Sequence, residues 1–207
     1  MKATVKLLCS SLWIVLLCMV ASGSTWRTQQ PSTVLRVSPS SSRVLVGRMT
    51  TISVEIERVS GLYGAQVHLR FDPAVLEVLD ADPAQDGVQV EPGTFPVPDF
   101  VVQNVADNSA GTIEFASTQM APNKPSEGQG TVFRVDFRGR KAGASPIQIE
   151  DFLLADTQAT SIGATPENGL IQVRPNPPWA WIVVIGFALA VLIGLAVYQL
   201  YRKRKRE

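Results

Sequence analysis

The chain has 207 residues with 19 Lys and Arg, 18 Asp and Glu and a single His, which is room for one ordinary domain plus targeting segments. Between residues 24 and 178, twelve basic residues stand against seventeen acidic ones, a net charge of −5, whereas residues 202–207 contain five basic residues. A mildly acidic domain beside a basic tail argues against nucleic acid as a partner, because phosphate binding needs Lys and Arg clustered on the folded part.

Residues 1–23 have the three parts of a secretory signal peptide: two lysines, an apolar run over 7–20, and small residues at the end. The apolar run is shorter than the roughly 20 residues that a membrane span needs, which favours cleavage over an uncleaved anchor. Cys9 and Cys18 both lie in this segment, so the mature chain has no thiol. No small residue directly precedes Cys18, so a lipoprotein signal is not indicated.

Residues 24–33 form a short polar leader, and short apolar runs separated by Gly, Pro, Asn and Asp follow it. None of these runs shows a sustained helical period. Many short strands predict an all-β domain, a sandwich or a barrel. The Pro- and Gly-rich stretch 80–99 leaves room for two weak strands. The expected strands are 34–37, 44–46, 52–56, 63–71, 75–79, 100–105, 112–116, 131–137, 146–152 and 170–173.

The most regular stretch is residues 61–79, GLYGAQVHLRFDPAVLEVL. Its alternation has the period of two that is typical of a strand with one buried face. Asp72 and Pro73 then end the strand, because proline has no N–H to donate to a ladder. The residues expected to face inward are Tyr63, Ala65, Val67, Leu69 and Phe71, and those expected to face outward are Gly64, Gln66, His68 and Arg70.

This stretch resembles the early strand pair of cohesin domains, the bacterial and archaeal modules that bind dockerin domains. The pieces GTIEFAS (111–117), GQGTVFRVDF (128–137) and NGLIQV (168–173) follow in the same order, and the resemblance covers residues 34–173. It implies a jelly-roll β-sandwich of about nine strands that has no catalytic activity and needs no cofactor.

The resemblance also implies a binding face, since cohesins bind dockerins with one face of the sandwich. In the best-studied cohesin class an Asn and an Asp stand where this chain has Gly64 and Gln66, and an acidic loop stands where it has 118–123 (TQMAPN). An outward polar patch suits protein recognition, although a plain solvated sheet face is the alternative. The candidate partner-binding residues are Gly64, Gln66, His68 and Arg70, with Glu114, Arg134 and Asp136 expected from neighbouring strands.

The C-terminal part is predicted to anchor the domain. Residues 174–178 (RPNPP) are a stiff spacer. Residues Trp179 to Tyr201 are almost wholly apolar, with Trp at one end and Tyr at the other, which predicts a single membrane span. The basic residues of 202–207 predict a cytoplasmic tail by the positive-inside rule, and hence an extracellular N-terminal domain on the cell membrane.

The sequence contains no catalytic motif. A serine or cysteine nucleophile needs a base beside it, and the mature chain offers only His68, which faces outward in its strand. Asp80, Asp82 and Asp86 are weak candidates for a calcium loop. Their spacing departs from the EF-hand pattern and includes a proline, which favours an ordinary acidic turn and no metal.

We therefore expect a non-catalytic, surface-anchored module, similar to cohesins, that holds a dockerin-bearing or other extracellular protein at the cell envelope. One alternative is a carbohydrate-binding module associated with polysaccharide catabolism. Its aromatic candidates are few: Trp26, Tyr63, Phe95 and Phe100. A second alternative is an accessory domain of an enzyme, with no partner specificity of its own.

Overall fold

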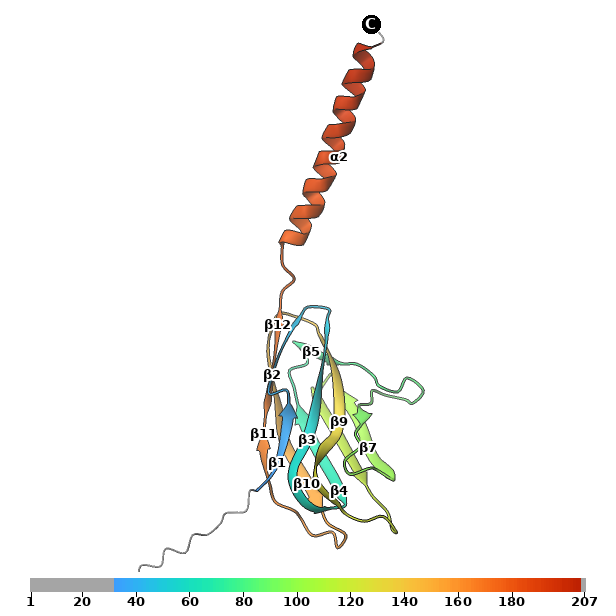
Figure 1. The fold of residues 1–207 in the computed structure, drawn as a ribbon, viewed down its shortest axis with the longest axis vertical. Coiled ribbons are helices and arrows are strands. Elements are labelled where there is room, and N and C mark those ends of the chain that lie inside the picture. The colour runs from blue at the N-terminus through green and yellow to red at the C-terminus, as the bar shows by residue number, and fades with distance from the viewer. Residues whose placement is uncertain (1–31, 206–207) are drawn as a thin grey trace, which may run out of the picture. The chain divides into compact units, whose positions relative to one another are not determined.

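The computed structural model describes residues 32–205, which form strands and one helix (Figure 1). The predicted signal peptide 1–23 and residues 24–31 of the leader lie outside the described residues. The strands are β1 Thr33–Ser38, β2 Ser41–Leu45, β3 Met49–Leu62, β4 Gly64–Arg70, β5 Leu76–Val78, β6 Glu91–Pro92, β7 Phe100–Asp107, β8 Thr112–Thr118, β9 Ser126–Gly139, β10 Gly143–Ala155, β11 Ala164–Glu167 and β12 Gly169–Arg174, and the helix is α2 Trp179–Arg204.

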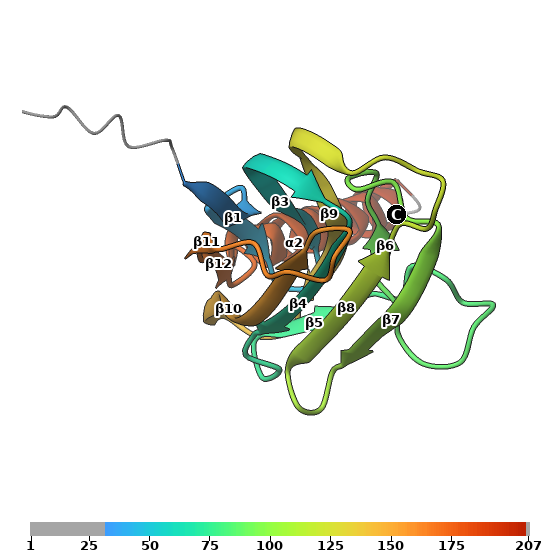
Figure 2. The ribbon, with the colours of Figure 1, turned by 90° about the horizontal axis from the view of Figure 1, so that it is seen from below.

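The strands form two sheets of six strands each, which lie face to face (Figure 2). The first, called here the β3–β9 sheet, has the order β11-β1-β3-β9-β5, with β6 also paired to β9. The second, the β4–β8 sheet, has the order β2-β12-β10-β4-β8-β7. The prediction of an all-β sandwich is confirmed.

The core lies between the two sheets and is filled by alternate residues of each strand. In β4, Ala65, Val67 and Leu69 are buried, as the alternation predicts. The sheets meet at aromatic pairs: the rings of Phe115 on β8 and Phe133 on β9 have their centroids 4.8 Å apart. Each fully buried side chain of this size contributes about 1.5–3 kcal/mol to folding, and no cysteine lies within residues 32–205.

The strand count differs from the prediction of about nine, because twelve strands are present in residues 32–205. The additions are short: β6 has two residues and β11 has four. Both pair with strands far away in sequence, β6 with β9 and β11 in parallel with β1. A short strand that forms because it pairs with a strand distant in sequence need not show an alternating pattern in its own residues.

Helix α2 covers the whole of the predicted span 179–201, and its described side chains are apolar and exposed at most positions. Within residues 32–205, however, no helix combines the length and apolar character that crossing a bilayer requires. The structure thus confirms a helix in this segment and does not support the membrane span.

Candidate interaction face

Strand β4 lies in the middle of the second sheet, between β10 and β8. Its outward residues Gln66, His68 and Arg70 are half-buried or exposed, because the odd-numbered side chains between them fill the core. Strand pairing places each of these residues in a row of neighbouring residues that runs across the sheet. The rows are Leu153–Gln66–Ala116–Gln103, Asp151–His68–Glu114–Val105, Gln148–Arg70–Thr112–Asp107 and Ala155–Gly64–Thr118–Phe100. We call the outward side of β10, β4, β8 and β7 the β7–β10 face.

Large apolar side chains lie exposed at both edges of this face. Leu153 on β10 is 48% exposed, while Phe100, Val102 and Val105 on β7 are 58%, 61% and 49% exposed. Val102 sits at an irregularity of the β7–β8 register, between Val101 and Gln103. An apolar group beside polar side chains on a flat sheet is typical of a protein interface.

The polar residues between the apolar edges contact one another. The amide nitrogen Nε2 of Gln66 lies 3.0 Å from Nε2 of His68. The amide of Gln103 on β7 donates to Glu114 on β8, and the guanidinium of Arg70 on β4 forms an ion pair with Glu150 on β10. These contacts fix the orientation of the polar side chains in the middle of the face.

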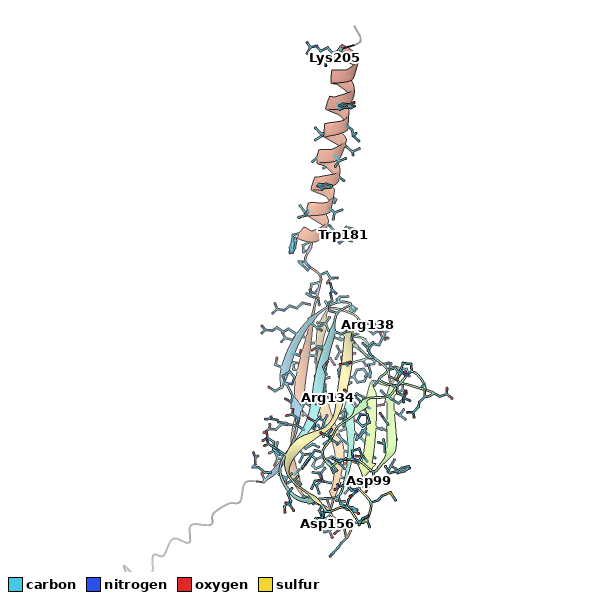
Figure 3. All side chains as sticks on the ribbon, turned by 45° about the vertical axis from the view of Figure 1, so that its right-hand side comes forward. Asp99, Arg134, Arg138, Asp156, Trp181 and Lys205 are labelled. Atoms are coloured by element: carbon cyan, nitrogen blue, oxygen red, sulfur yellow. The ribbon has the colours of Figure 1, made fainter. Side chains whose placement is uncertain are left out.

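Two of the predicted patch residues lie elsewhere. Both Arg134 (Figure 3) and Asp136 are on β9. This strand pairs with β3, β5 and β6 in the other sheet. They line a hollow of about 350 Å³ together with Asp80 and Glu91. The expectation that they extend the patch around Gln66 is therefore wrong, whereas Glu114 does lie directly opposite His68.

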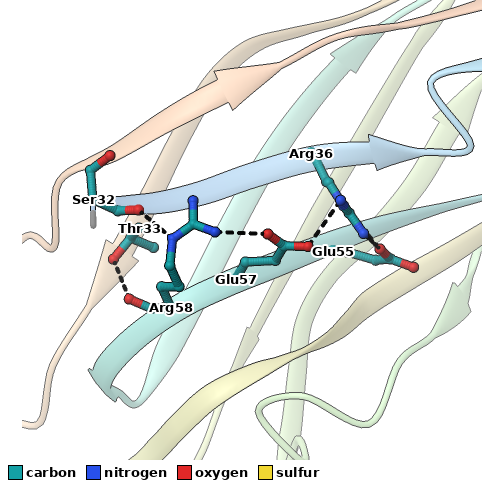
Figure 4. Close-up of polar contacts among 6 residues, drawn as sticks. All are labelled: Ser32, Thr33, Arg36, Glu55, Glu57 and Arg58. Carbon is teal, nitrogen blue, oxygen red and sulfur yellow. Dashed lines mark hydrogen bonds and ion pairs between the residues drawn. The ribbon is translucent and has the colours of Figure 1, made fainter. Parts of the chain in front are cut away.

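The outward side of the β3–β9 sheet carries charges that are already paired (Figure 4). Arg36 on β1 binds Glu55 at 3.0 Å and Glu57 at 2.9 Å, and Glu57 also binds Arg58 at 3.1 Å. The hydrogen bond to Glu55 raises the pKa of the Arg36 guanidinium. Thr33 donates to the carbonyl oxygen of Arg58 at 3.1 Å. The charged groups on the β1–β3 part of this side therefore satisfy each other, whereas the hollow lined by Arg134 and Asp136 lies at β9.

The acidic stretch after β5 forms a turn. The carboxylate of Asp80 accepts the backbone N–H groups of Asp82 and Gln89, both at 3.1 Å. Asp82 in turn accepts the backbone N–H of Ala84 and the side-chain amide of Gln85. Asp86 is exposed. Over the described residues, no three His, Cys, Asp or Glu side chains are grouped so that they could hold a metal ion.

The loop 118–123 is held against the start of β7. One carboxylate oxygen of Asp99 (Figure 3) accepts the backbone N–H of Met120 and the side-chain amide of Asn123, both at 2.7 Å. These hydrogen bonds, above all that from Met120, lower the pKa of Asp99. Met120 itself is exposed, so it adds an apolar side chain at the end of the face where Phe100 lies.

Among the described residues, the aromatic candidates Tyr63, Phe95 and Phe100 do not form a sugar-stacking row. Trp26 lies outside the described residues. Phe95 packs against the core, Tyr63 is half-buried, and Phe100 is exposed on β7. Stacking platforms present several ring faces side by side, and these rings do not do so.

The sequence prediction missed the apolar edges of the face. A signal for Leu153 exists, since Phe152, Leu153 and Leu154 are consecutive and only alternate residues of a strand can face the core. The same holds for the apolar run at the start of β7, where Val102 and Phe100 face outward. Which sheet these strands join cannot be read from such runs.

Comparison with known proteins agrees with this geometry. The model of the cohesin domain family matches residues 36–173, about two thirds of the chain. The chain belongs to the cohesin family. Cohesin domains are non-catalytic protein interaction modules, so this chain is not an enzyme.

Solved cohesins share the fold. A type II cohesin domain from the cellulosome of Acetivibrio cellulolyticus matches with a TM-score of 0.59 and 23% identity, over 68% of this chain and 95% of that one. A cohesin from a type I cohesin–dockerin complex of Clostridium thermocellum matches with a TM-score of 0.57 and 14% identity, over 70% of this chain and 100% of that one. A single cohesin module accounts for nearly all of each of these chains. Among the described residues of this chain, the core of the sandwich is built from residues 35–173 alone.

A curated relative is "Cell surface glycoprotein 1" of Acetivibrio thermocellus. It is 27% identical over 124 residues, which are 53% of this chain. The matched part spans only 5% of that protein's length. The similarity therefore concerns a small part of that protein.

Proposed function

We propose that this cohesin module binds a dockerin-bearing protein through the β7–β10 face. The observation that carries the proposal is the contrast between the two outer sides of the sandwich. The β7–β10 face exposes Leu153, Phe100, Val102 and Val105 around a polar centre. The other side presents the paired charges around Arg36. Burial of exposed apolar area drives association, while charges that are already paired gain little from a partner.

The partner class follows from family membership. The C. thermocellum cohesin of similar fold is in complex with a dockerin. In this chain Gly64 and Gln66 replace the Asn and Asp of the best-studied cohesin class, so the apolar edges supply the larger part of the binding energy. The polar centre, with Gln66, His68, Arg70 and Glu114, would then set which dockerin fits.

The test is retention of the module, residues 32–174, by immobilised type I and type II dockerins, next to a panel of insoluble polysaccharides. We expect binding to at least one dockerin. Leu153→Asp and Val105→Asp should each weaken it at least tenfold, because a charge would be buried at the edge of the interface.

Met49→Asp is the matched control. Met49 is at least as exposed as Leu153 and Val105, and it lies on β3 in the other sheet, so the same change there should leave affinity unaltered. Retention by polysaccharides alone would replace the dockerin proposal with the carbohydrate-binding alternative. Retention by neither would favour an accessory domain without a partner of its own.

We further propose that residues 1–23 direct secretion and that residues 179–201 hold the module at the cell membrane, with residues 202–207 in the cytoplasm. Supporting this are the exposed apolar side chains along α2, including Trp179, Trp181 and Tyr198, and the basic residues that follow. The similarity to a cell surface glycoprotein supports an extracellular position of the sandwich.

A further inference from the structure

The side chains of Gln66 and His68 form a pair at the centre of the β7–β10 face. Nε2 of Gln66 faces Nε2 of His68 at 3.0 Å. An amide nitrogen can only donate, so the ring nitrogen accepts. The ring in this arrangement is therefore neutral and carries its proton on Nδ1. The carbonyl arm of the Gln66 amide is turned away from the ring.

Charged groups from both neighbouring strands surround this pair. Register places Glu114 of β8 and Asp151 of β10 on either side of His68. One row further along β4, Arg70 is ion-paired with Glu150 of β10. With a neutral ring, the centre of the face thus offers hydrogen-bond acceptors and negative charge.

Protonation of His68 is incompatible with the contact as it stands. Both ring nitrogens of a charged imidazole are donors, so Nε2–H of the ring would face the N–H groups of Gln66. Rotating the Gln66 amide by half a turn removes this conflict, because its oxygen then accepts from the ring. The amide would then turn its donor nitrogen away from the ring, where the acceptor oxygen had been.

We propose that this pair is a proton-operated switch of partner binding. With a neutral ring, the face accepts hydrogen bonds and suits a partner surface that donates them, such as lysine, arginine or amide groups. With a protonated ring, the face gains a positive charge and a donor at its centre, and such a partner is released. This inference rests on the proposed function for its biological consequence, but the switch itself is a property of the free module.

The switch is tested first without a partner. His68 is the single histidine of the chain, so its ring signals in an NMR titration of residues 32–174 need no further assignment. We expect the side-chain amide signals of Gln66 to shift over the same pH range as the ring of His68, and to lose this shift in His68→Gln. The amide of Gln148, which is exposed on β10, serves as the control. A Gln66 amide that stays unchanged while the ring titrates overturns the switch.

The second test asks whether protonation of His68 changes partner binding. It uses a dockerin that binds the module in the retention experiment described under the proposed function. Affinity is measured at pH 8 and pH 5.5 for the wild type and for His68→Gln, which stays neutral. The ratio between the two proteins cancels the dockerin's own pH dependence. We expect the wild type to lose about tenfold more affinity at pH 5.5 than the variant, as the reversal of one charge-assisted contact implies.

Equal losses in the two proteins would overturn the coupling between His68 and partner binding. A module that no dockerin retains at either pH would overturn the proposed function instead. In that case the NMR titration still decides the switch, so the two failures are distinguishable.

Discussion

At the scale of single residues, two asparagines, one on β7 and one just after it, hold the residue before β6 and the last residue of β5. Asn104 accepts from the backbone N–H of Val90 and donates to its carbonyl oxygen, both at 2.8 Å. Asn108 does the same with Val78, at 2.7 and 3.0 Å. Both valines are buried, and their strand neighbours do not supply these bonds. Each asparagine amide thus makes the two backbone hydrogen bonds that an adjacent strand would otherwise make.

We expect Asn108→Ala to lower the free energy of unfolding by about 2 kcal/mol, because it leaves the buried N–H and C=O groups of Val78 without partners. Urea unfolding of residues 32–174 measures this. Asn123→Ala is the control: its amide is exposed and makes one hydrogen bond, to Asp99, so the loss there should be much smaller. Equal losses at the two positions would show that the Asn108 contacts add nothing.

Asp107 makes stability depend on acid pH. Its carboxylate accepts from the hydroxyl of Ser109 at 2.6 Å and from the backbone N–H groups of Ser109 and Ala110. These hydrogen bonds, first that of the hydroxyl, lower the pKa of Asp107 below its ordinary value. A carboxyl whose folded pKa is depressed stabilises the fold above its unfolded pKa, about 3.9, and loses that contribution as the pH falls further.

Asp107→Asn should therefore reduce the urea midpoint at pH 7 and have a smaller effect at pH 3, where the wild-type carboxyl is becoming protonated. The exposed loop residue Asp86, changed to Asn, is the control. If Asp107→Asn has the same effect at both pH values, the turn does not depend on the ionised carboxylate.

At the scale of elements, the segment after β6 lies directly on β9. The backbone N–H of Gly93 donates to Val132 at 2.8 Å, and that of Phe95 donates to Thr131 at 3.0 Å. A Cβ atom at Gly93 would overlap the backbone carbonyl of Thr131. The close approach thus requires glycine at this position.

Gly93→Ala should separate β6 from β9 and cost about 2 kcal/mol of unfolding free energy or more, because the backbone of β9 cannot move aside cheaply. Gly163→Ala is the matched control, since a Cβ there meets nothing within 4 Å. Thermal unfolding of both variants measures the difference. A Gly93→Ala variant as stable as Gly163→Ala would mean that the segment can shift without loss.

At the scale of the whole molecule, the sandwich has one outer side with paired charges and one with exposed apolar groups. This difference would make docking directional, because the β7–β10 face exposes more large apolar side chains that a partner could bury than the other side does. If residues 179–201 anchor the chain as proposed, the C-terminal segment would determine where that docking happens.

The anchor predicts where the protein is found in the cell. We expect the full chain to stay with membranes after alkaline carbonate extraction, and a chain ending at Pro178 to be released into the medium, because the apolar segment is then missing. Cell fractionation with an antibody to the sandwich measures both. A full chain that is extracted by carbonate would contradict the anchor.

The sequence by itself determined the all-β class, the alternation of β4 and the outward position of Gln66, His68 and Arg70, because a period of two is a local property of the strand. It also carried the family resemblance.

Only the tertiary structure decided which strands share a sheet. It placed Arg134 and Asp136 in the other sheet and brought Leu153 and Val105 to the edges of one face. These outcomes depend on pairings between strands far apart in sequence, such as β10 with β4. The alternation within a strand fixes which of its side chains are buried, but it carries no information about the strand's neighbours.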